Sequence, residues 1–224
     1  MGLQDILKSL GSLFGGAAPR LPAIPQPVAG PAMPAQPVLP DPGDVQVQQV
    51  QDRLLTDHFR LFEATSTSNT ALQGKNHCLS ANQIATLTET CKLAEIIRTE
   101  LGCAVDCHSA YRCPELNGAT PGAAKKSQHM LCQAMDLSPA GPDTESSIQA
   151  AFDKILAAAK AKKFKFGQLI IEQANRSYGK ALWIHVSLGP GYREPSRCGE
   201  VMKMVAAADG TPEYTMLEKV PQEA

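Results

Sequence analysis

The sequence predicts an α+β domain in which a small, mainly antiparallel sheet is flanked by helices. Two segments, 80–100 and 144–160, repeat apolar residues at helical spacing, and four shorter segments have the composition of strands. The two patterns cluster along the chain instead of alternating strictly, which favours α+β over a parallel α/β fold. Hydrophobic residues make up 43% of the chain and aromatic residues only 5%, so aliphatic side chains and alanine must build the core.

The 224 residues are enough for one domain of ordinary size plus appendages. Residues 1–16 carry apolar residues at helical spacing, which predicts an amphipathic helix that could dock on a protein partner or a membrane surface, or form only a locally packed terminus. Residues 17–44 are rich in proline and alanine and predict an extended linker, because each proline fixes φ and removes a donor. We place the folded domain at 45–200 and a C-terminal extension at 201–224.

Both predicted helices have recognisable ends. Ser80 or Asn82 could cap the first helix and Gly102 would stop it, while Asp143 is the expected cap of the second. Each helix presents an apolar stripe toward the core, made in turn by Ile84, Leu87, Cys91, Leu93, Ala94, Ile97 and Leu101, and by Ile148, Phe152, Ile155 and Leu156.

The predicted strands are Cys103–Tyr111, Met130–Leu137, Gln168–Gln173 and Ala181–Leu188. A turn around Tyr178-Gly179 joins the last two into a hairpin. The last strand alternates cleanly, so that Ile184 points toward the core and His185 points away from it.

Charge, hydropathy and cysteine content bear on the partners and the compartment of the protein. Lys+Arg number 21 and Asp+Glu 22, so the net charge of -1 gives no argument for nucleic acid or an anionic membrane as a partner. No transmembrane segment of about 20 apolar residues is present, and Asp5 and Lys8 interrupt any signal-peptide pattern. Seven cysteines without C-x-x-C spacing indicate mostly free thiols and synthesis in a reducing cytoplasm.

The segment 127–136 carries the sharpest chemical signal. On a strand, Cys132 and Ala134 would lie on the same face as Asp136, and their small side chains would leave room for a ligand. His129 and Asp136 are seven residues apart, so on a regular strand they would face opposite ways. They converge only if His129 precedes the strand or a bulge intervenes, and the spacing alone leaves this open.

The pattern S-x-H-x-x-x-x-A-x-D at 127–136, followed by W-I-H-V-S at 183–187, resembles the zinc D-alanyl-D-alanine carboxypeptidase family. That family includes phage endolysin peptidases and shares a fold with the hedgehog signalling domain. Two further segments resemble it: H-F-R-L-F-E at 58–63 is similar to its opening segment, and S-A-Y-R at 109–112 to its S-G-Y-R. The resemblance implies that the domain is a zinc peptidase with a hedgehog/DD-peptidase-like fold.

The resemblance also implies a metal site. His129, Asp136 and His185 would bind one zinc ion, and a fourth position would stay open for water, as catalytic zinc requires. Without a metal, the same residues would be a structural His/Asp hydrogen-bond pair and an unrelated histidine.

Four other residues acquire roles from the same resemblance. Arg112 would contact the substrate and stabilise an oxyanion, unless it is a solvated surface arginine. Tyr111 or Ser109 would help to orient the substrate, and Ser127 would bind it or support the neighbouring histidine.

The general base has to be found separately. Some relatives have an acidic residue three positions before the last histidine, where this chain has Leu182. We predict Glu172 instead, because a hairpin that turns between Tyr178 and Gly179 would place Glu172 directly opposite His185. A cross-strand Glu–His contact without catalysis is the alternative.

Two positions depart from the family, since Cys132 and Ala110 stand where it has glycine, and either could narrow the cleft or shift the backbone. His108 is expected to face away from Ser109 on an alternating strand and receives no catalytic role.

The sequence thus predicts a zinc-dependent peptidase that hydrolyses an amide bond in peptidoglycan stem peptides, either D-Ala-D-Ala or an L-Ala-D-amino acid bond. Its site of action would be the cell wall or periplasm, in an endolysin-like phage or bacterial setting. The alternative, supported by Leu182, is a catalytically inactive zinc- or cell-wall-binding structural module. A thiol enzyme that uses Cys132 with His129 is a third hypothesis, although no orienting group is visible.

Overall fold

The structure is a computed structural model that describes residues 48–142, 144–176 and 179–222. Four expectations fall wholly or partly outside these residues: the helix at 1–16, the linker at 17–44, the capping role of Asp143 and the turn at Tyr178.

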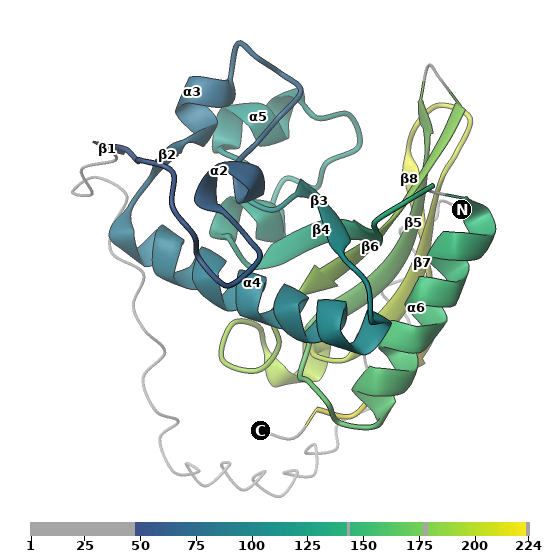
Figure 1. Ribbon diagram of the computed structural model, residues 1–224. Coiled ribbons are helices and arrows are strands. Elements are labelled where there is room, and N and C mark those ends of the chain that lie inside the picture. The colour runs from purple at the N-terminus through teal and green to yellow at the C-terminus, as the bar shows by residue number, and fades with distance from the viewer. Residues whose placement is uncertain (1–47, 143, 177–178, 223–224) are drawn as a thin grey trace, which may run out of the picture. The chain divides into compact units, whose positions relative to one another are not determined.

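Six strands form the main sheet: β3 (Val105–Ser109), β4 (Ala134–Pro139), β5 (Gln168–Arg176), β6 (Gly179–Ser187), β7 (Glu200–Ala206) and β8 (Pro212–Lys219). Their order across the sheet is β3-β4-β6-β5-β7-β8 (Figure 1). Neighbouring strands are antiparallel except β5 and β7, which run parallel. The predicted α+β class, with a mainly antiparallel sheet and helices packed against it, is confirmed.

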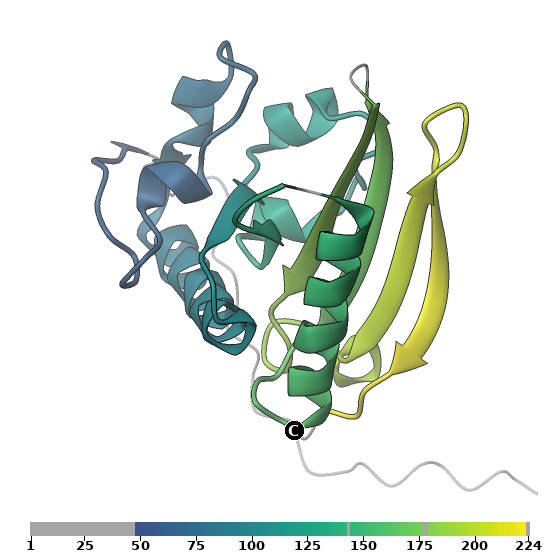
Figure 2. The ribbon, with the colours of Figure 1, turned by 45° about the vertical axis from the view of Figure 1, so that its right-hand side comes forward.

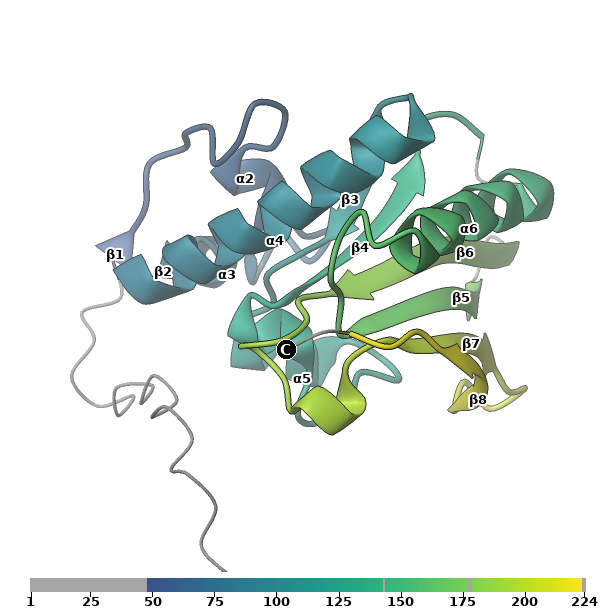
Figure 3. The same cartoon turned by 90° about the horizontal axis from the view of Figure 1, so that it is seen from below.

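Two long helices, α4 (Ala81–Leu101) and α6 (Glu145–Lys160), cover one face of the sheet (Figure 3). Ser80 caps α4, because its side chain accepts a hydrogen bond from the Gln83 amide, and Gly102 ends it with φ 72°. Thr144 is the residue that caps α6. Between helices and sheet lies the core, in which Leu137 and Ile184, paired across β4 and β6, are both fully buried.

Short elements complete the fold on the side of α4 and around the ends of the strands: β1 (Gln48–Gln49), β2 (Cys78–Leu79), α2 (Leu61–Ala64), α3 (Gln73–Asn76), α5 (Pro114–Ala119), η1 (Gln128–Leu131) and η2 (Pro195–Arg197). Within the part of the chain that is described, no helix has both the length and the apolarity to cross a membrane.

The predicted strand at 130–137 is partly wrong. Its first residues belong to η1, a single turn of 3-10 helix, and the strand begins only at Ala134. Cys132 ends η1 in the left-handed conformation, with φ 58°. Glycine adopts this conformation without strain, which explains physically why a glycine suits this position.

The sheet also continues past residue 200, where the sequence analysis placed the end of the domain. β7 pairs with β5 from Gln168–Glu200 to Gln173–Val205, and β8 pairs with β7 at the edge (Figure 2). Residues 200–219 are therefore part of the sheet that carries the site.

Residue alternation gives the sheet a second, chemically different face. Asp136, His185, Ile170 and Met202 are direct neighbours on β4, β6, β5 and β7, and their side chains point away from α4 and α6. This face, which we call the site face, holds the candidate functional residues.

Candidate metal centre

Two of the three predicted ligands face each other across the sheet. Asp136 on β4 pairs directly with His185 on β6, so both side chains rise from the site face. The Asp136 Oδ1 lies 2.8 Å from His185 Nδ1. Neighbouring residues on the same two strands, Leu137 and Ile184, hold this register by burial in the core.

The third ligand, His129, comes from η1, which solves the spacing problem left open by the sequence. Because η1 precedes the strand and turns sharply at Cys132, His129 folds back over Asp136. The Ser127 side chain caps this turn by accepting a hydrogen bond from the His129 amide at 3.3 Å. The backbone carbonyl of His129 in turn accepts from the Arg112 amide at 3.2 Å.

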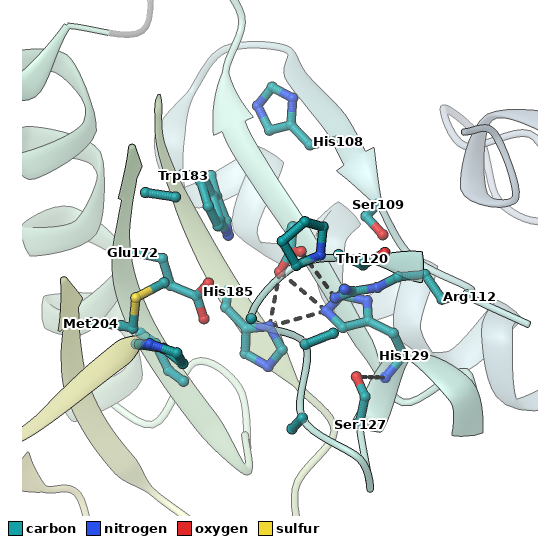
Figure 4. A pocket seen from close by; sticks show the side chains of 18 of the residues that line it. His108, Ser109, Arg112, Thr120, Ser127, His129, Glu172, Trp183, His185 and Met204 are labelled. Atoms are coloured by element: carbon teal, nitrogen blue, oxygen red, sulfur yellow. Dashed lines mark hydrogen bonds and ion pairs between the residues drawn. The ribbon is translucent and has the colours of Figure 1, made fainter. Parts of the chain in front are cut away.

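The facing atoms of the three residues form a small triangle (Figure 4). His129 Nε2 lies 3.2 Å from Asp136 Oδ1 and 3.3 Å from His185 Nδ1, and the third edge is the 2.8 Å between His185 and Asp136. In a tetrahedral zinc site with bonds of about 2.0–2.1 Å, neighbouring ligand atoms lie about 3.3 Å apart. The geometry therefore suits a single small divalent ion. Among the described residues, these three are the group of His, Cys, Asp or Glu side chains whose ligand atoms lie close enough together to share one ion.

Each imidazole is oriented by a partner on its outer nitrogen. His129 Nδ1 lies 2.8 Å from the Ala110 carbonyl oxygen, and His185 Nε2 lies 3.3 Å from Gln128 Oε1. Both partners are acceptors, so each outer nitrogen can donate, and a metal would take the lone pair of each inner nitrogen in place of the proton that links His185 Nδ1 to Asp136. Such outer hydrogen bonds fix the tautomer that a metal needs.

The electrostatics of the three residues favour a cation between them. Burial alone would raise the pKa of Asp136, but the charges and hydrogen bonds of His129 and His185 outweigh burial and lower it. Burial lowers the pKa of His129, whereas for His185 burial is outweighed by the hydrogen bond and charge of Asp136, which raise its pKa. One ionised carboxylate thus faces two imidazoles, and a metal would compete with the proton on His185.

Arg112 lies beside the same carboxylate. Its Nη2 is 3.5 Å from Asp136 Oδ2, and its side chain is 14% exposed. The Nε atom is buried without a hydrogen-bond partner among the described residues. This burial argues against the alternative of a solvated surface arginine, and the guanidinium can donate to a group that enters the site.

Glu172 is near the centre, although not by the predicted register. The hairpin register pairs Glu172 with Trp183 and His185 with Ile170, so the prediction that Glu172 lies opposite His185 is wrong by two residues. A displacement of two keeps Glu172 on the site face, diagonal to His185. Figure 4 places Glu172 and Arg112 on opposite sides of the two imidazoles.

The Glu172 carboxyl titrates in an unusual range. The residue is 9% exposed, and burial together with the Asp136 charge raises its pKa to about 7, while His185, Arg112 and the Trp183 hydrogen bond act to lower it. A buried carboxyl with a pKa near neutrality can exchange a proton with a ligand at working pH.

The remaining predicted residues separate into two groups. Ser109 and Ser127 line the cleft above the metal centre, together with Arg112 and Glu172. Tyr111 does not: it is 4% exposed, belongs to the core, and its hydroxyl lies 3.5 Å from Gln83 Nε2. The expectation that Tyr111 contacts substrate therefore does not fit the structure. Neighbouring residues point to opposite sides here, so Arg112 points into the site and Tyr111 into the core.

Sequence reasoning also misplaced His108. A bulge between Cys107 and Ser109 breaks the alternation of β3, so His108 and Ser109 both line the cleft. His108 Nε2 lies 2.8 Å from Ser138 Oγ. Cys132, proposed as a possible nucleophile, is fully buried in the core and burial raises the pKa of its thiol, which argues against a thiol enzyme.

The cleft has a volume of about 940 Å³ and runs along the site face between the loops at 66–69 and 119–127 and the strands β5 to β8. Asp136 and His185 of the candidate metal centre line this cleft and come from adjacent strands.

Comparison with protein families supports the assignment of these residues to a peptidase domain. The family described as Peptidase M15 matches residues 58–187, more than half of the chain. Comparisons with curated proteins and with solved structures gave no match. The matched segment ends at the last residue of β6 and contains all three residues of the candidate centre. The chain belongs to the Peptidase M15 family.

Proposed function

We propose that this member of the Peptidase M15 family is a zinc metallopeptidase that hydrolyses an amide bond in peptidoglycan stem peptides. The bond would be D-Ala-D-Ala, as in a carboxypeptidase, or L-Ala-D-amino acid, as in an endopeptidase. The observation that carries the proposal is the triangle of His129 Nε2, Asp136 Oδ1 and His185 Nδ1, with edges of 3.2, 2.8 and 3.3 Å. The substrate class rests on the resemblance of the sequence motifs to zinc D-alanyl-D-alanine carboxypeptidases.

The donor set fits zinc. Two imidazole nitrogens and one carboxylate oxygen are a common three-ligand set of catalytic zinc sites, and such sites keep a fourth position for water or substrate. When bound, zinc polarises the scissile carbonyl and acidifies a water molecule.

Glu172 is the proposed general base. Its carboxylate takes a proton from the attacking water and returns it to the leaving amine. In the metal-free protein the pKa of Glu172 is about 7, and a raised pKa suits delivery of a proton to the amine. A nearby zinc ion would lower this pKa toward the ionised form that accepts the proton from water. The cleft gives Glu172 access to a ligand, and its burial excludes bulk water from the carboxylate.

Arg112 is the proposed stabiliser of negative charge on the carbonyl oxygen. Its guanidinium is already held beside Asp136 at 3.5 Å, and its buried Nε has a donor to offer. A fixed, desolvated donor of this kind stabilises charge that develops during the reaction without having to reorganise. Ser109 and Ser127, which also line the cleft, are proposed to hydrogen-bond the substrate backbone.

The alternative of an inactive binding module loses its main support. That support was Leu182, which occupies the position where some relatives have an acid. Glu172 supplies a carboxyl on the site face from the neighbouring strand, so hydrolysis is favoured. An endolysin-type role at the cell wall or periplasm is proposed from the resemblance.

The test is digestion of purified muropeptides by the zinc-loaded chain, with products identified by mass spectrometry. We expect the wild type to release a D-alanine or to cut after L-alanine. Glu172→Gln should bind zinc and lose most activity, and His129→Ala should lose both. Arg53→Gln, at an exposed position outside the cleft, is the matched control. Zinc binding without any product across several wall chemistries would refute the peptidase and favour the binding module.

A further inference from the structure

The lining of the cleft carries an excess of positive charge, although the chain as a whole does not. Five cationic side chains line it, whereas the carboxylates in its lining are Asp136 and Glu172; the five are Arg112, Lys126, Lys180, Arg193 and Arg197. The whole chain has a net charge of -1, so positive charge is concentrated in the cleft. A cleft with one sign of charge attracts ligands of the other sign.

Two of these cations are held together at one end of the cleft. Arg193 Nη2 lies 2.8 Å from Glu200 Oε2, and Arg197 Nε lies 3.6 Å from Glu200 Oε1. Gln168 Nε2 also donates to Glu200 Oε2 at 3.0 Å, which fixes the carboxylate on the sheet. One carboxylate therefore positions two guanidinium groups, so this cluster carries one more positive than negative charge.

The two arginines are not saturated by these contacts. Arg193 is largely buried, with 12% of its side chain exposed, and its Nε has no hydrogen-bond partner among the described residues. Arg197 has 61% of its side chain exposed and, among the described residues, a long contact to Glu200, so its side chain has room to turn toward a ligand. A buried, fixed guanidinium beside an exposed one matches the geometry of a carboxylate clamp.

Two hydrogen bonds and one close packing contact connect this end of the cleft to the candidate metal centre. His185 Nε2 lies 3.3 Å from Gln128 Oε1, and Gln128 Nε2 donates to Ser187 Oγ at 3.0 Å. Gly167 lies next to Ser187, and a Cβ at Gly167 would come within 3.2 Å of Arg193 Cδ. The absence of a side chain at Gly167 thus lets Arg193 lie close to the floor that holds the metal ligands.

The separation can be estimated from the sheet. Glu200 on β7 lies two strands away from His185 on β6. Along the strands it is displaced by two residues, because His185 is in line with Met202 on β7. With strands ~5 Å apart and ~7 Å between same-face residues, the two Cα atoms are about 12 Å apart. An extended peptide covers about 3.3 Å per residue, so this distance corresponds to roughly three or four residues.

We propose that Arg193 and Arg197 form a subsite for a carboxylate of the substrate, roughly three or four residues from the scissile bond. The substrate class is then an acidic peptide, and the subsite reads a free carboxylate on it. This inference rests on the proposed peptidase function and extends it, because it assigns specificity to residues outside the metal centre.

The test uses two synthetic stem peptides that are identical except that an acidic residue carries a free carboxylate in one and a carboxamide in the other. For wild type, Arg197→Gln, Arg197→Lys and the control Arg53→Gln, kcat/KM is measured with both peptides. The value for the carboxylate peptide is then divided by the value for the carboxamide peptide. Charge-assisted hydrogen bonds predict that the wild type prefers the carboxylate about 10- to 100-fold. We expect Arg197→Gln to reduce the preference several-fold, Arg197→Lys to retain part of it, and the control to leave it unchanged.

A binding measurement separates this inference from the peptidase proposal. Affinities of both peptides for zinc-loaded Glu172→Gln, with and without Arg197→Gln, are determined by calorimetry. A carboxylate preference in binding that Arg197→Gln reduces supports the subsite even if no peptide is cleaved. The subsite is refuted if wild type and Arg197→Gln show the same carboxylate-to-carboxamide ratio, or if the zinc-loaded protein binds neither peptide.

Discussion

Replacing Glu172 with glutamine should remove most of the activity and at the same time stabilise the folded protein. The carboxyl has its pKa raised from 4.5 to about 7, chiefly by burial and next by Asp136. A folded state that holds its proton more tightly than the unfolded state loses stability as the pH rises between these two values. At 1.36 kcal/mol per pH unit, the ionised carboxylate costs about 3 kcal/mol above pH 7.

The sign of the effect makes it measurable. Below pH 4.5, Glu172 is protonated in both states, and Glu172→Gln should differ little from wild type. The stability advantage of the variant should then grow with pH and level off near 3 kcal/mol above pH 7. This value is an upper limit, because the glutamine amide has to find its own hydrogen bonds.

The assay is urea unfolding of the chelator-treated chain at several pH values. With a slope of about 2 kcal/mol per M, the predicted advantage moves the midpoint by about 1.5 M at high pH. Bound zinc should shrink the difference, because a nearby cation lowers the cost of the Glu172 charge. An advantage for the variant that is the same at pH 4 and pH 8 would refute the argument, since the pH dependence comes from the carboxyl alone.

Three further predictions follow from the same geometry. Chelation should lower the thermal midpoint of the wild type but not of His129→Ala, because only a protein that binds the ion is stabilised by it; a calorimetric scan checks this. The kcat/KM of the zinc-loaded enzyme should fall on the acidic side with an apparent pKa at or below about 7, because Glu172 must be ionised and the metal lowers its pKa, and Glu172→Gln should remove that limb. Gly199→Ala should destabilise the chain by about 2 kcal/mol or more, measured by urea unfolding, because Gly199 has φ 79° and a Cβ there would collide with the Val220 carbonyl.

Much of the fold could be predicted because its signals are local. The apolar stripes of α4 and α6, the serine cap and Gly102 are all read from neighbouring residues. The same is true of the β5–β6 hairpin, whose pairing needs only a turn. Its register was misjudged by two residues, because the turn was placed at Tyr178 and Gly179 and the paired strand in fact brings Arg176 opposite Gly179.

The residues of the candidate metal centre could be named from the sequence, but their convergence could not be predicted from it. Nothing in the spacing of His129 and Asp136 indicates a 3-10 turn, and a strand pattern was the simpler interpretation of 130–137. The turn depends on Cys132 in a left-handed conformation, which a cysteine rarely adopts. Its carbonyl accepts a hydrogen bond from Thr90 at 2.7 Å, so tertiary contacts with α4 hold what local propensity would not.

The basic end of the cleft was missed for a different reason. Glu200 reaches Gln168 only because β7 runs parallel to β5, and a parallel pairing requires a crossover rather than a turn. No local sequence pattern predicts which strand β7 will pair with after such a connection. The residues found from the sequence are therefore those that the family motifs or the hairpin identify. The residues proposed to set specificity lie where the chain returns to the sheet from far away. Specificity in this enzyme should accordingly respond to changes in the segment after β6 that leave the metal centre intact.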